Sequence, residues 1–245
     1  MTQEDKLEIP LTMAFLDHLE ELRWRLVKAI LAIFILAIAA FFLINPVIRF
    51  LIEPAISLTE PLKLQVLKVQ GMFVIQIMVS IAVGFILAIP VWVWQLWQFI
   101  GPGLKPQERK YAIPVILVTF LNFLLGTAFA YYLVLPIALE FLLGINFPED
   151  IVPNVALDQY INFVVVLMLG MGTIFELPVL SFILTRFRLL TYQLMRRIQR
   201  YAVVAIFIIA AFFTPPDPFS QIMMALPVIM LYELSVWISK WAEPK

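Results

Sequence analysis

Residues 27–44 read VKAILAIFILAIAAFFLI, an apolar run of 18 residues in which Lys28 is the only charged residue. A helix of this length can cross the hydrocarbon core of a bilayer. The run also lacks the small-x-small cleavage site that ends a secretory signal. We therefore expect a retained first membrane helix, and this expectation sets the fold class.

The composition of the whole chain agrees with a membrane protein. Hydrophobic residues make up 63% of the 245 residues and charged residues 14%, whereas soluble domains have about 45–50% and about 25%. The 17 basic residues balance the 17 acidic ones, so the chain lacks the net positive field on which non-specific nucleic-acid binding depends. The absence of cysteine excludes disulfides, thiolate metal sites and cysteine nucleophiles.

Long apolar runs bounded by charges or by Pro and Gly predict an all-α membrane protein with six transmembrane helices. We expect one polytopic domain over residues 1–245, with a short cytoplasmic interfacial helix near 12–26 and spans near 27–48, 71–98, 111–140, 158–184, 200–213 and 219–239. The connections 49–70 and 141–157 are short for independent cores, and we expect them to cap the bundle.

The distribution of basic residues predicts the orientation in the membrane. All but three of the 17 Lys and Arg residues fall in the tails or in loops on one side, and only Arg49, Lys63 and Lys68 lie on the other. The positive-inside rule places the richer side in the cytoplasm. An even number of spans then puts both termini in the cytoplasm.

The fifth predicted span is short, because only 13 residues separate Arg200 from Thr214. That gives about 20 Å of helix, less than the roughly 30 Å of hydrocarbon. Three interpretations stay open: a bilayer thinned beside the hairpin, polar ends such as Ser220 and Gln221 below the nominal surface beside water, or a hairpin buried in protein.

Two carboxylates on the predicted cytoplasmic face are candidate functional residues. Glu21 lies in the amphipathic segment before the first span, where it could also form a simple i,i+4 surface pair with Arg25. Glu108 follows a loop rich in Gly and Pro, where it could also just complement the start of the next helix. Carboxylates accept the paired donors of arginine, so binding of a guanidinium group is the alternative at Glu108.

Glu176 is a candidate functional residue inside the membrane. It precedes Arg186 by ten residues, or about 15 Å of helix. An intramembrane carboxylate faces a bundle interior or a wet cavity, or stays protonated as a hydrogen-bond donor. The structural alternative is an interhelical hydrogen bond to a residue such as Asn122 or Gln95, and Pro178 can kink the same helix.

The sequence offers no set of residues for covalent chemistry. It contains no Ser/His/Asp motif, HExxH pair, Walker loop or GxGxxG, and the single histidine, His18, has no second ligand in its neighbourhood. We therefore predict no enzyme activity, no cofactor and no metal site.

Four motifs make the chain resemble the TatC family, the multispanning subunit of the twin-arginine protein translocase. They are HLEELRWRL at residues 18–26, Phe99-Ile100-x-Pro102-x-Leu104 followed by Glu108-Arg109, Phe175-Glu176-x-Pro178, and TPPDPFSQ at residues 214–221. The motifs occur in the family's order and at matching places in a six-span topology. The departures are small: Gly101 and Gly103 stand where alanines are common, and Pro218 adds a third proline to the last motif.

The resemblance implies a function and residues that carry it. Such a protein is the receptor and core of the translocase in a bacterial-type cytoplasmic (inner) membrane. It has a cupped, glove-like bundle with short fifth and sixth helices, and the proton-motive force drives transport of folded cargo. Its partners are twin-arginine signal peptides, single-span TatA/TatB-type subunits, the lipid bilayer and further copies of itself. The signal-peptide site maps onto Glu21, Arg23, Phe99, Pro102 and Glu108, the intramembrane acid onto Glu176, and the periplasmic turn and partner contact onto Asp217 and Gln221.

A proton-coupled small-solute transporter is the alternative function, with Glu176 as its relay. Neither an inverted repeat nor a pair of broken helices, which such transporters commonly have, is evident in the sequence.

Overall fold

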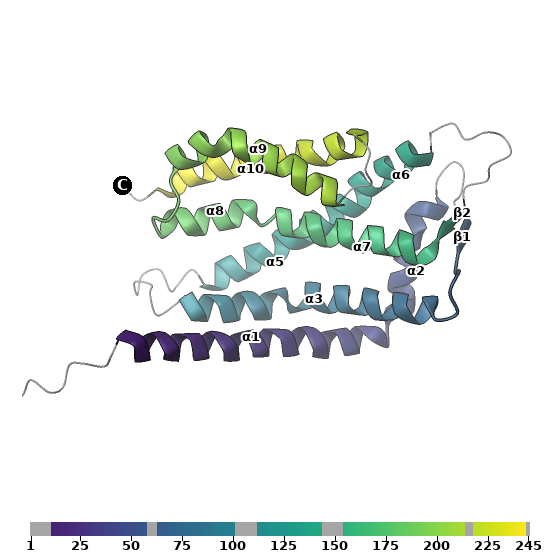
Figure 1. The fold of residues 1–245 in the computed structure, drawn as a ribbon, viewed down its shortest axis with the longest axis horizontal. Helices are drawn as coiled ribbons and strands as arrows, with labels where there is room; N and C mark the ends of the chain where they lie inside the picture. Colours follow the sequence, from purple (N-terminus) through teal and green to yellow (C-terminus); the bar gives the residue numbers. More distant parts are fainter. Residues whose placement is uncertain (1–10, 58–62, 101–111, 144–153, 214–217, 244–245) are drawn as a thin grey trace, which may run out of the picture.

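The protein is helical throughout most of its length. The computed structural model describes residues 11–57, 63–100, 112–143, 154–213 and 218–243. The elements in chain order are α1 Leu11–Phe41, α2 Ile44–Ile56, β1 Lys63–Gln65, α3 Gly71–Ile100, α5 Ala112–Phe129, a π-helical turn Ala130–Val134, α6 Leu135–Leu143, β2 Asn154–Ala156, α7 Leu157–Ile174, α8 Leu177–Arg186, α9 Tyr192–Phe213 and α10 Pro218–Ala242. Figure 1 shows most of these helices side by side along one axis.

Among the described residues, five helical segments are long and apolar enough to cross a membrane. They are His18–Phe41, Gly71–Phe99, Ala112–Phe141, Leu157–Arg186 and Gln221–Ala242. Helix α9 is not among them, because its first half carries Arg196, Arg197 and Arg200. The chain is thus a multi-pass membrane protein with five such segments and the shorter apolar half of α9. The α9–α10 hairpin ends short of the end of the bundle that carries β1 and β2 (Figure 1).

The first helix begins, and the last helix ends, on the same side of the bundle. Figure 1 places the start of α1, the end of α3, the turn between α8 and α9, and the end of α10 together at one end. The opposite end carries α2 and the two strands. The loops rich in Lys and Arg therefore connect helices at one end, as the sequence predicted from alternating connections.

The N-terminal region forms one helix instead of an interfacial helix followed by a span. Helix α1 runs without a break from Leu11 to Phe41, so no boundary occurs near residue 26, and it ends seven residues before the predicted position 48. Pro46 lies in the first turn of α2, where the missing N–H of proline costs no helical hydrogen bond. The predicted connection 49–70 therefore contains most of a second helix.

A tyrosine compensates for the proline inside α2. Pro54 has no N–H to donate to the carbonyl of Phe50, four residues earlier. The Tyr131 hydroxyl donates to that carbonyl at 2.6 Å, and the two rings stack with centroids 4.1 Å apart. Tyr131 lies in the π-helical turn that ends α5. The proline and the tyrosine together hold α2 against the bundle.

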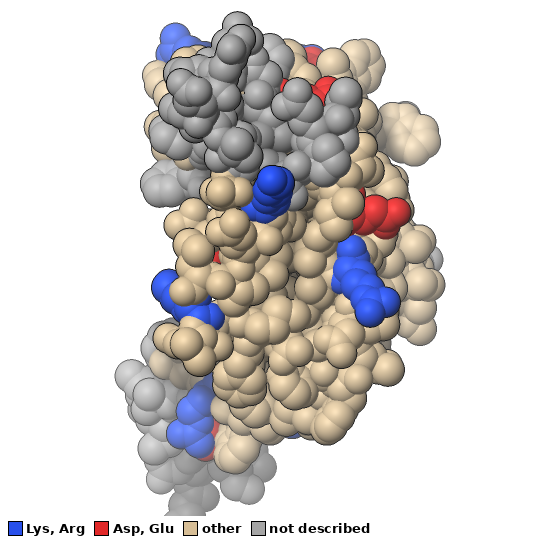
Figure 2. Space-filling model, turned by 90° about the vertical axis from the view of Figure 1, so that its right-hand side faces the viewer, with Lys and Arg blue, Asp and Glu red and all other residues tan. Residues whose placement is uncertain are grey.

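Two short strands connect the predicted caps. β1 and β2 pair in parallel, with Lys63 opposite Asn154 and Gln65 opposite Ala156. Lys68 Nζ lies 3.6 Å from Asp158 Oδ2 just beyond the strands. Figure 2 looks onto this end, where a few charged side chains lie on a mostly uncharged surface.

Helix α1 packs closely along α3. A Cβ atom added to Gly84 would lie 2.6 Å from the Ala37 backbone nitrogen, so only glycine permits this approach. Small residues at helix contacts are how membrane helices gain packing without a hydrophobic driving force. The close packing aligns the two helices up to the end where Glu21 and Phe99 lie.

Candidate functional site

The end of α1 at which the chain begins holds a compact cluster around Glu21. Arg25, one turn later, donates from Nε to Glu21 Oε1 at 3.0 Å and also from Nη2 to the same oxygen. His18 Nδ1 lies 3.3 Å from the other oxygen, Oε2. The Glu21 side chain remains 35% exposed and that of Arg25 19% exposed. The carboxylate is therefore neutralised by its own helix but is open to solvent.

Helix α3 contributes two residues to this cluster. Arg25 Nη1 donates to Gln98 Oε1 at 2.7 Å. The Phe99 ring stacks on the His18 imidazole, with centroids 4.2 Å apart and planes 9° from parallel. We call His18, Glu21, Arg25, Gln98 and Phe99 the α1–α3 cluster.

The structure brings together two of the five residues predicted for signal-peptide binding, Glu21 and Phe99. Arg23 lies apart from the α1–α3 cluster: its Nη2 is 3.8 Å from Glu20 Oε1, and its guanidinium lies over the Trp24 ring. Pro102 and Glu108 lie outside the described residues. They belong to the segment 101–111, which connects the end of α3 to α5.

Glu176 lies at a break between two helices, where the sequence predicted a kink. Helix α7 ends at Ile174 and α8 begins at Leu177, with Pro178 in its first turn. Proline lacks the N–H that would continue the helical hydrogen bonds through this point. The Glu176 side chain is buried, with 8% of the residue exposed.

The carboxyl group of Glu176 lies near the Thr119 side chain of α5, within hydrogen-bonding reach. Its Oε1 atom is buried without a partner among the described residues. The sequence predicted Asn122 or Gln95 near this carboxyl group. Asn122 lies on the same helix as Thr119, about one turn further along. Thr119 shares a face of α5 with Gly126, whose missing Cβ lets α7 approach closely. This approach brings α5 and the break at Glu176 together.

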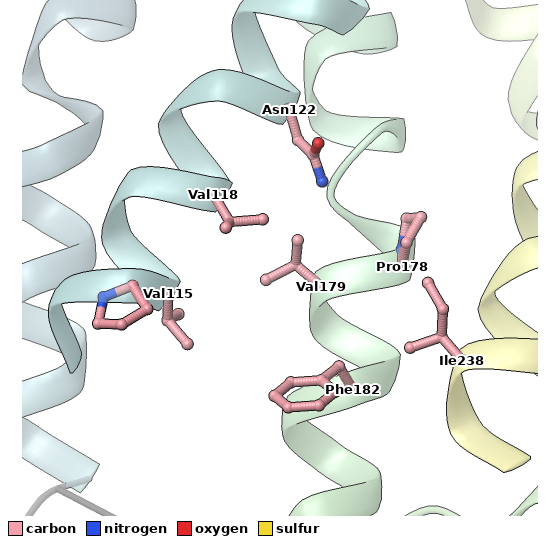
Figure 3. Close-up of a pocket in the computed structure, with 8 residues that line it drawn as sticks. Val115, Val118, Asn122, Pro178, Val179, Phe182 and Ile238 are labelled. Atoms are coloured by element: carbon pink, nitrogen blue, oxygen red, sulfur yellow. The ribbon is translucent and has the colours of Figure 1, made fainter. Parts of the chain in front are cut away.

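An apolar cavity of about 310 Å³ lies beside this break, between α5, α8 and α10. Its walls are Pro114, Val115, Val118 and Asn122 of α5, Pro178, Val179 and Phe182 of α8, and Ile238 of α10. Figure 3 shows the Asn122 amide directed toward α8, close to the bend that follows Glu176. Asn122 is the one side-chain hydrogen-bonding group in this lining.

Hydroxyl groups fix α10 against α8 on the far side of the cavity. Ser181 donates to the Ser235 carbonyl at 3.1 Å, and the Thr185 and Ser239 hydroxyls lie 2.8 Å apart. All four residues are buried. At the other end of the hairpin, Gln221 Nε2 donates to the Phe207 carbonyl of α9 at 2.9 Å. Asp217, predicted with Gln221 as a partner contact, lies outside the described residues.

These features define a class of protein. Within the described chain, no three His, Asp or Glu side chains are grouped to hold a metal ion. The polar groups form one exposed cluster at a helix end and one buried carboxyl within the bundle. The class is a polytopic membrane protein whose candidate sites are suited to binding.

Comparison with known proteins identifies the family. Residues 17–227 match the family model described as Sec-independent protein translocase protein (TatC). The chain is 37% identical over 234 residues to the TatC of Carboxydothermus hydrogenoformans, covering 95% of both, and 38% identical over 234 residues to that of Aquifex aeolicus, covering 95% of this chain and 97% of the relative. It also matches a crystal structure of the twin-arginine translocase receptor TatC with a TM-score of 0.83 at 38% identity, covering 92% of this chain and 99% of the other.

The chain belongs to the TatC family, which confirms the resemblance found in its motifs. It is a subunit of the twin-arginine protein translocase, a transport component and not an enzyme.

Proposed function

We propose that this subunit is the receptor for twin-arginine signal peptides and that the α1–α3 cluster is part of the receptor site. The observation that carries the proposal is the cluster itself: a partly exposed carboxylate, Glu21, is contacted by His18, and the His18 ring stacks on the aromatic ring of Phe99 from another helix. A carboxylate binds a guanidinium through charge-assisted hydrogen bonds, and an aromatic face can bind its planar cation.

The connection after α3 completes the site. The segment that follows Phe99 contains Pro102 and Glu108, so a second carboxylate lies nine residues after the cluster in sequence. Two carboxylates match the two guanidinium groups of the signal. Arg23 faces away from Glu21. It adds a positive charge to this end of the protein and contacts the Trp24 ring.

The site faces the cytoplasm in this proposal. The end of the bundle that carries the α1–α3 cluster also carries the turn between α8 and α9, and arginines lie in this turn and in the adjoining ends of both helices. The positive-inside rule places such an end in the cytoplasm. Six spans follow if α9 crosses with its apolar half, which runs from Tyr201 to Phe213, beside a locally thinned bilayer. Both termini are then cytoplasmic.

The apolar stretch of the signal peptide docks on the concave side of a cup-shaped bundle. The cavity between α5, α8 and α10 supports this proposal, because its lining is apolar and it lies next to Glu176. Single-span TatA/TatB-type subunits and further copies of the chain assemble around the bundle, with Asp217 and Gln221 at the external turn of the α9–α10 hairpin. Glu176 provides a polar side chain on this largely apolar face within the membrane.

Charge reversal at Glu108 tests the receptor site. Glu108→Lys turns an attraction for guanidinium into repulsion, so crosslinking of a twin-arginine signal peptide should fall by about tenfold or more while folding is preserved. Glu140→Lys is the matched control, because Glu140 is an exposed carboxylate on α6. Equal crosslinking to Glu108→Lys and to the parent would refute the assignment of Glu108.

Glu21→Ala extends the test to the described part of the site. The loss of binding should exceed any loss of helix, measured by circular dichroism on the same sample. A loss of helix that accounts for the whole binding defect would instead assign Glu21 to helix stability, through its pair with Arg25.

A further inference from the structure

Arg25 occupies the oxygen that a guanidinium from outside would approach. Both Nε and Nη2 of Arg25 donate to Glu21 Oε1, and the remaining oxygen is held by His18. An arginine of the signal peptide therefore approaches a carboxylate that is already bound by Arg25. It can form the same paired hydrogen bonds only if Arg25 gives up its own.

Arg25 also has a second place to bind. Its third nitrogen, Nη1, donates to Gln98 Oε1 of α3 at 2.7 Å while the other two contact Glu21. An arginine displaced from Glu21 would thus keep a hydrogen-bond partner on the neighbouring helix. This lowers the cost of displacement, because the guanidinium is not left without partners.

From this geometry we propose that Arg25 is an internal ligand of the signal site, an autoinhibitory contact that holds Glu21 until a signal arginine replaces it. The inference rests on the proposed receptor function. A receptor whose binding-competent form is only a fraction of the population has its apparent affinity reduced by that fraction. Arg25 therefore sets a threshold: strong ligands displace it, and weakly bound cationic segments fail to do so.

The mechanism predicts how affinity changes when Arg25 is removed. Competition reduces the apparent affinity of every ligand of Glu21 by the same factor. Arg25→Gln should therefore tighten binding of a twin-arginine peptide and of its twin-lysine variant by the same factor, about two- to fivefold for a partly exposed i,i+4 pair. The ratio between the two peptides should stay unchanged. Arg25→Lys keeps the charge with fewer donors and should lie between the parent and Arg25→Gln.

Lys28→Gln is the matched control for the loss of one positive charge. Lys28 is exposed, lies one turn after Arg25 on the same helix, and has no ion pair within the described part of the chain. Affinities are measured by fluorescence anisotropy with the full chain in nanodiscs, and the thermal unfolding midpoint of each variant is recorded. Tighter binding to Arg25→Gln than to Lys28→Gln, with an unchanged peptide ratio, supports the internal ligand.

Two results would overturn the proposal while leaving the receptor function intact. Weaker binding to both Arg25→Gln and Arg25→Lys would mean that Arg25 supports Glu21 as part of the site. Equal tightening in Arg25→Gln and Lys28→Gln would reduce its effect to general charge. By contrast, a parent protein that fails to bind the twin-arginine peptide would contradict the receptor function itself.

Discussion

The Phe99 ring lies flat against the His18 imidazole, with centroids 4.2 Å apart. His18 also contacts Glu21 Oε2, so the stack connects an aromatic side chain of α3 to the orientation of a carboxylate on α1. The two helices that form this junction are aligned by the close contact of Gly84 with Ala37.

Phe99→Ala should weaken binding of a twin-arginine signal peptide by about two- to tenfold, which is the equivalent of one aromatic pair. Phe99→Tyr keeps the stack and should remain within about twofold of the parent. Trp94→Ala removes an aromatic side chain from an exposed position of the same helix and is the control for general loss of aromatic surface. Affinity in nanodiscs is the measurement, and unchanged binding to Phe99→Ala would separate the stack from the site.

Tyr131 and Pro54 should act as one unit in folding stability. Tyr131→Phe leaves the Phe50 carbonyl without a donor and should cost about 1–2 kcal/mol. Pro54→Ala supplies the missing backbone N–H, so the same tyrosine substitution should cost about 1 kcal/mol less in that background. The free energy of unfolding in detergent, measured over the double-mutant cycle, checks the coupling.

Tyr160→Phe provides the control for this cycle. Tyr160 donates to the Leu51 carbonyl at 2.9 Å, whose helical partner would be residue 55 and not Pro54. Its cost should be the same with or without Pro54. Equal costs for Tyr131→Phe in both backgrounds would contradict the coupling.

Glu176→Gln should be tolerated better than Glu176→Leu in both complex assembly and protein export. Glutamine keeps the size of the side chain and a partner for the Thr119 hydroxyl, whereas leucine leaves that buried hydroxyl unpaired. Co-purification of partner subunits and export of a folded reporter are the two measurements. A Gln variant that assembles and binds signals but does not export would assign the acid a direct role in coupling, and a Leu variant equal to the parent would remove Glu176 from the functional site.

Reporter fusions test the orientation of the bundle. Fusions after Lys245 or near Gln107 and Gln193 should report a cytoplasmic location, and those near Ser57 and Asp150 an external one. The reason is the concentration of basic residues in loops at one end. External accessibility of the turn near Gln193 would contradict the six-span proposal.

The sequence predicted contacts that depend on helical spacing and missed those that depend on distant segments. The Glu21–Arg25 pair follows from an i,i+4 spacing, whereas Gln98 contacts Arg25, and Phe99 contacts His18, from a helix more than 70 residues away along the chain. The β1–β2 pairing was missed for the same reason, because three-residue strands far apart in sequence leave no periodic pattern.

Apolar helices also conceal which of their faces are in contact. Helix α5 is hydrophobic around its whole circumference, so spacing could not distinguish Thr119 from Asn122 as the partner of Glu176. The break beside Glu176 was predictable from Pro178, because proline acts on its own helix. In the sequence, only Pro46 indicated that α1 ends near Phe41. The length of the apolar run instead favoured a span that continues to residue 48.

The most direct test of the account is the affinity of the full chain in nanodiscs for a twin-arginine signal peptide and for the same peptide with both arginines changed to lysine. A carboxylate site that recognises the paired hydrogen-bond donors of guanidinium should bind the lysine peptide about ten- to a hundredfold more weakly. Equal affinity for the two peptides would show that the protein senses only charge, and would contradict the claim that Glu21 and its neighbours form the receptor site.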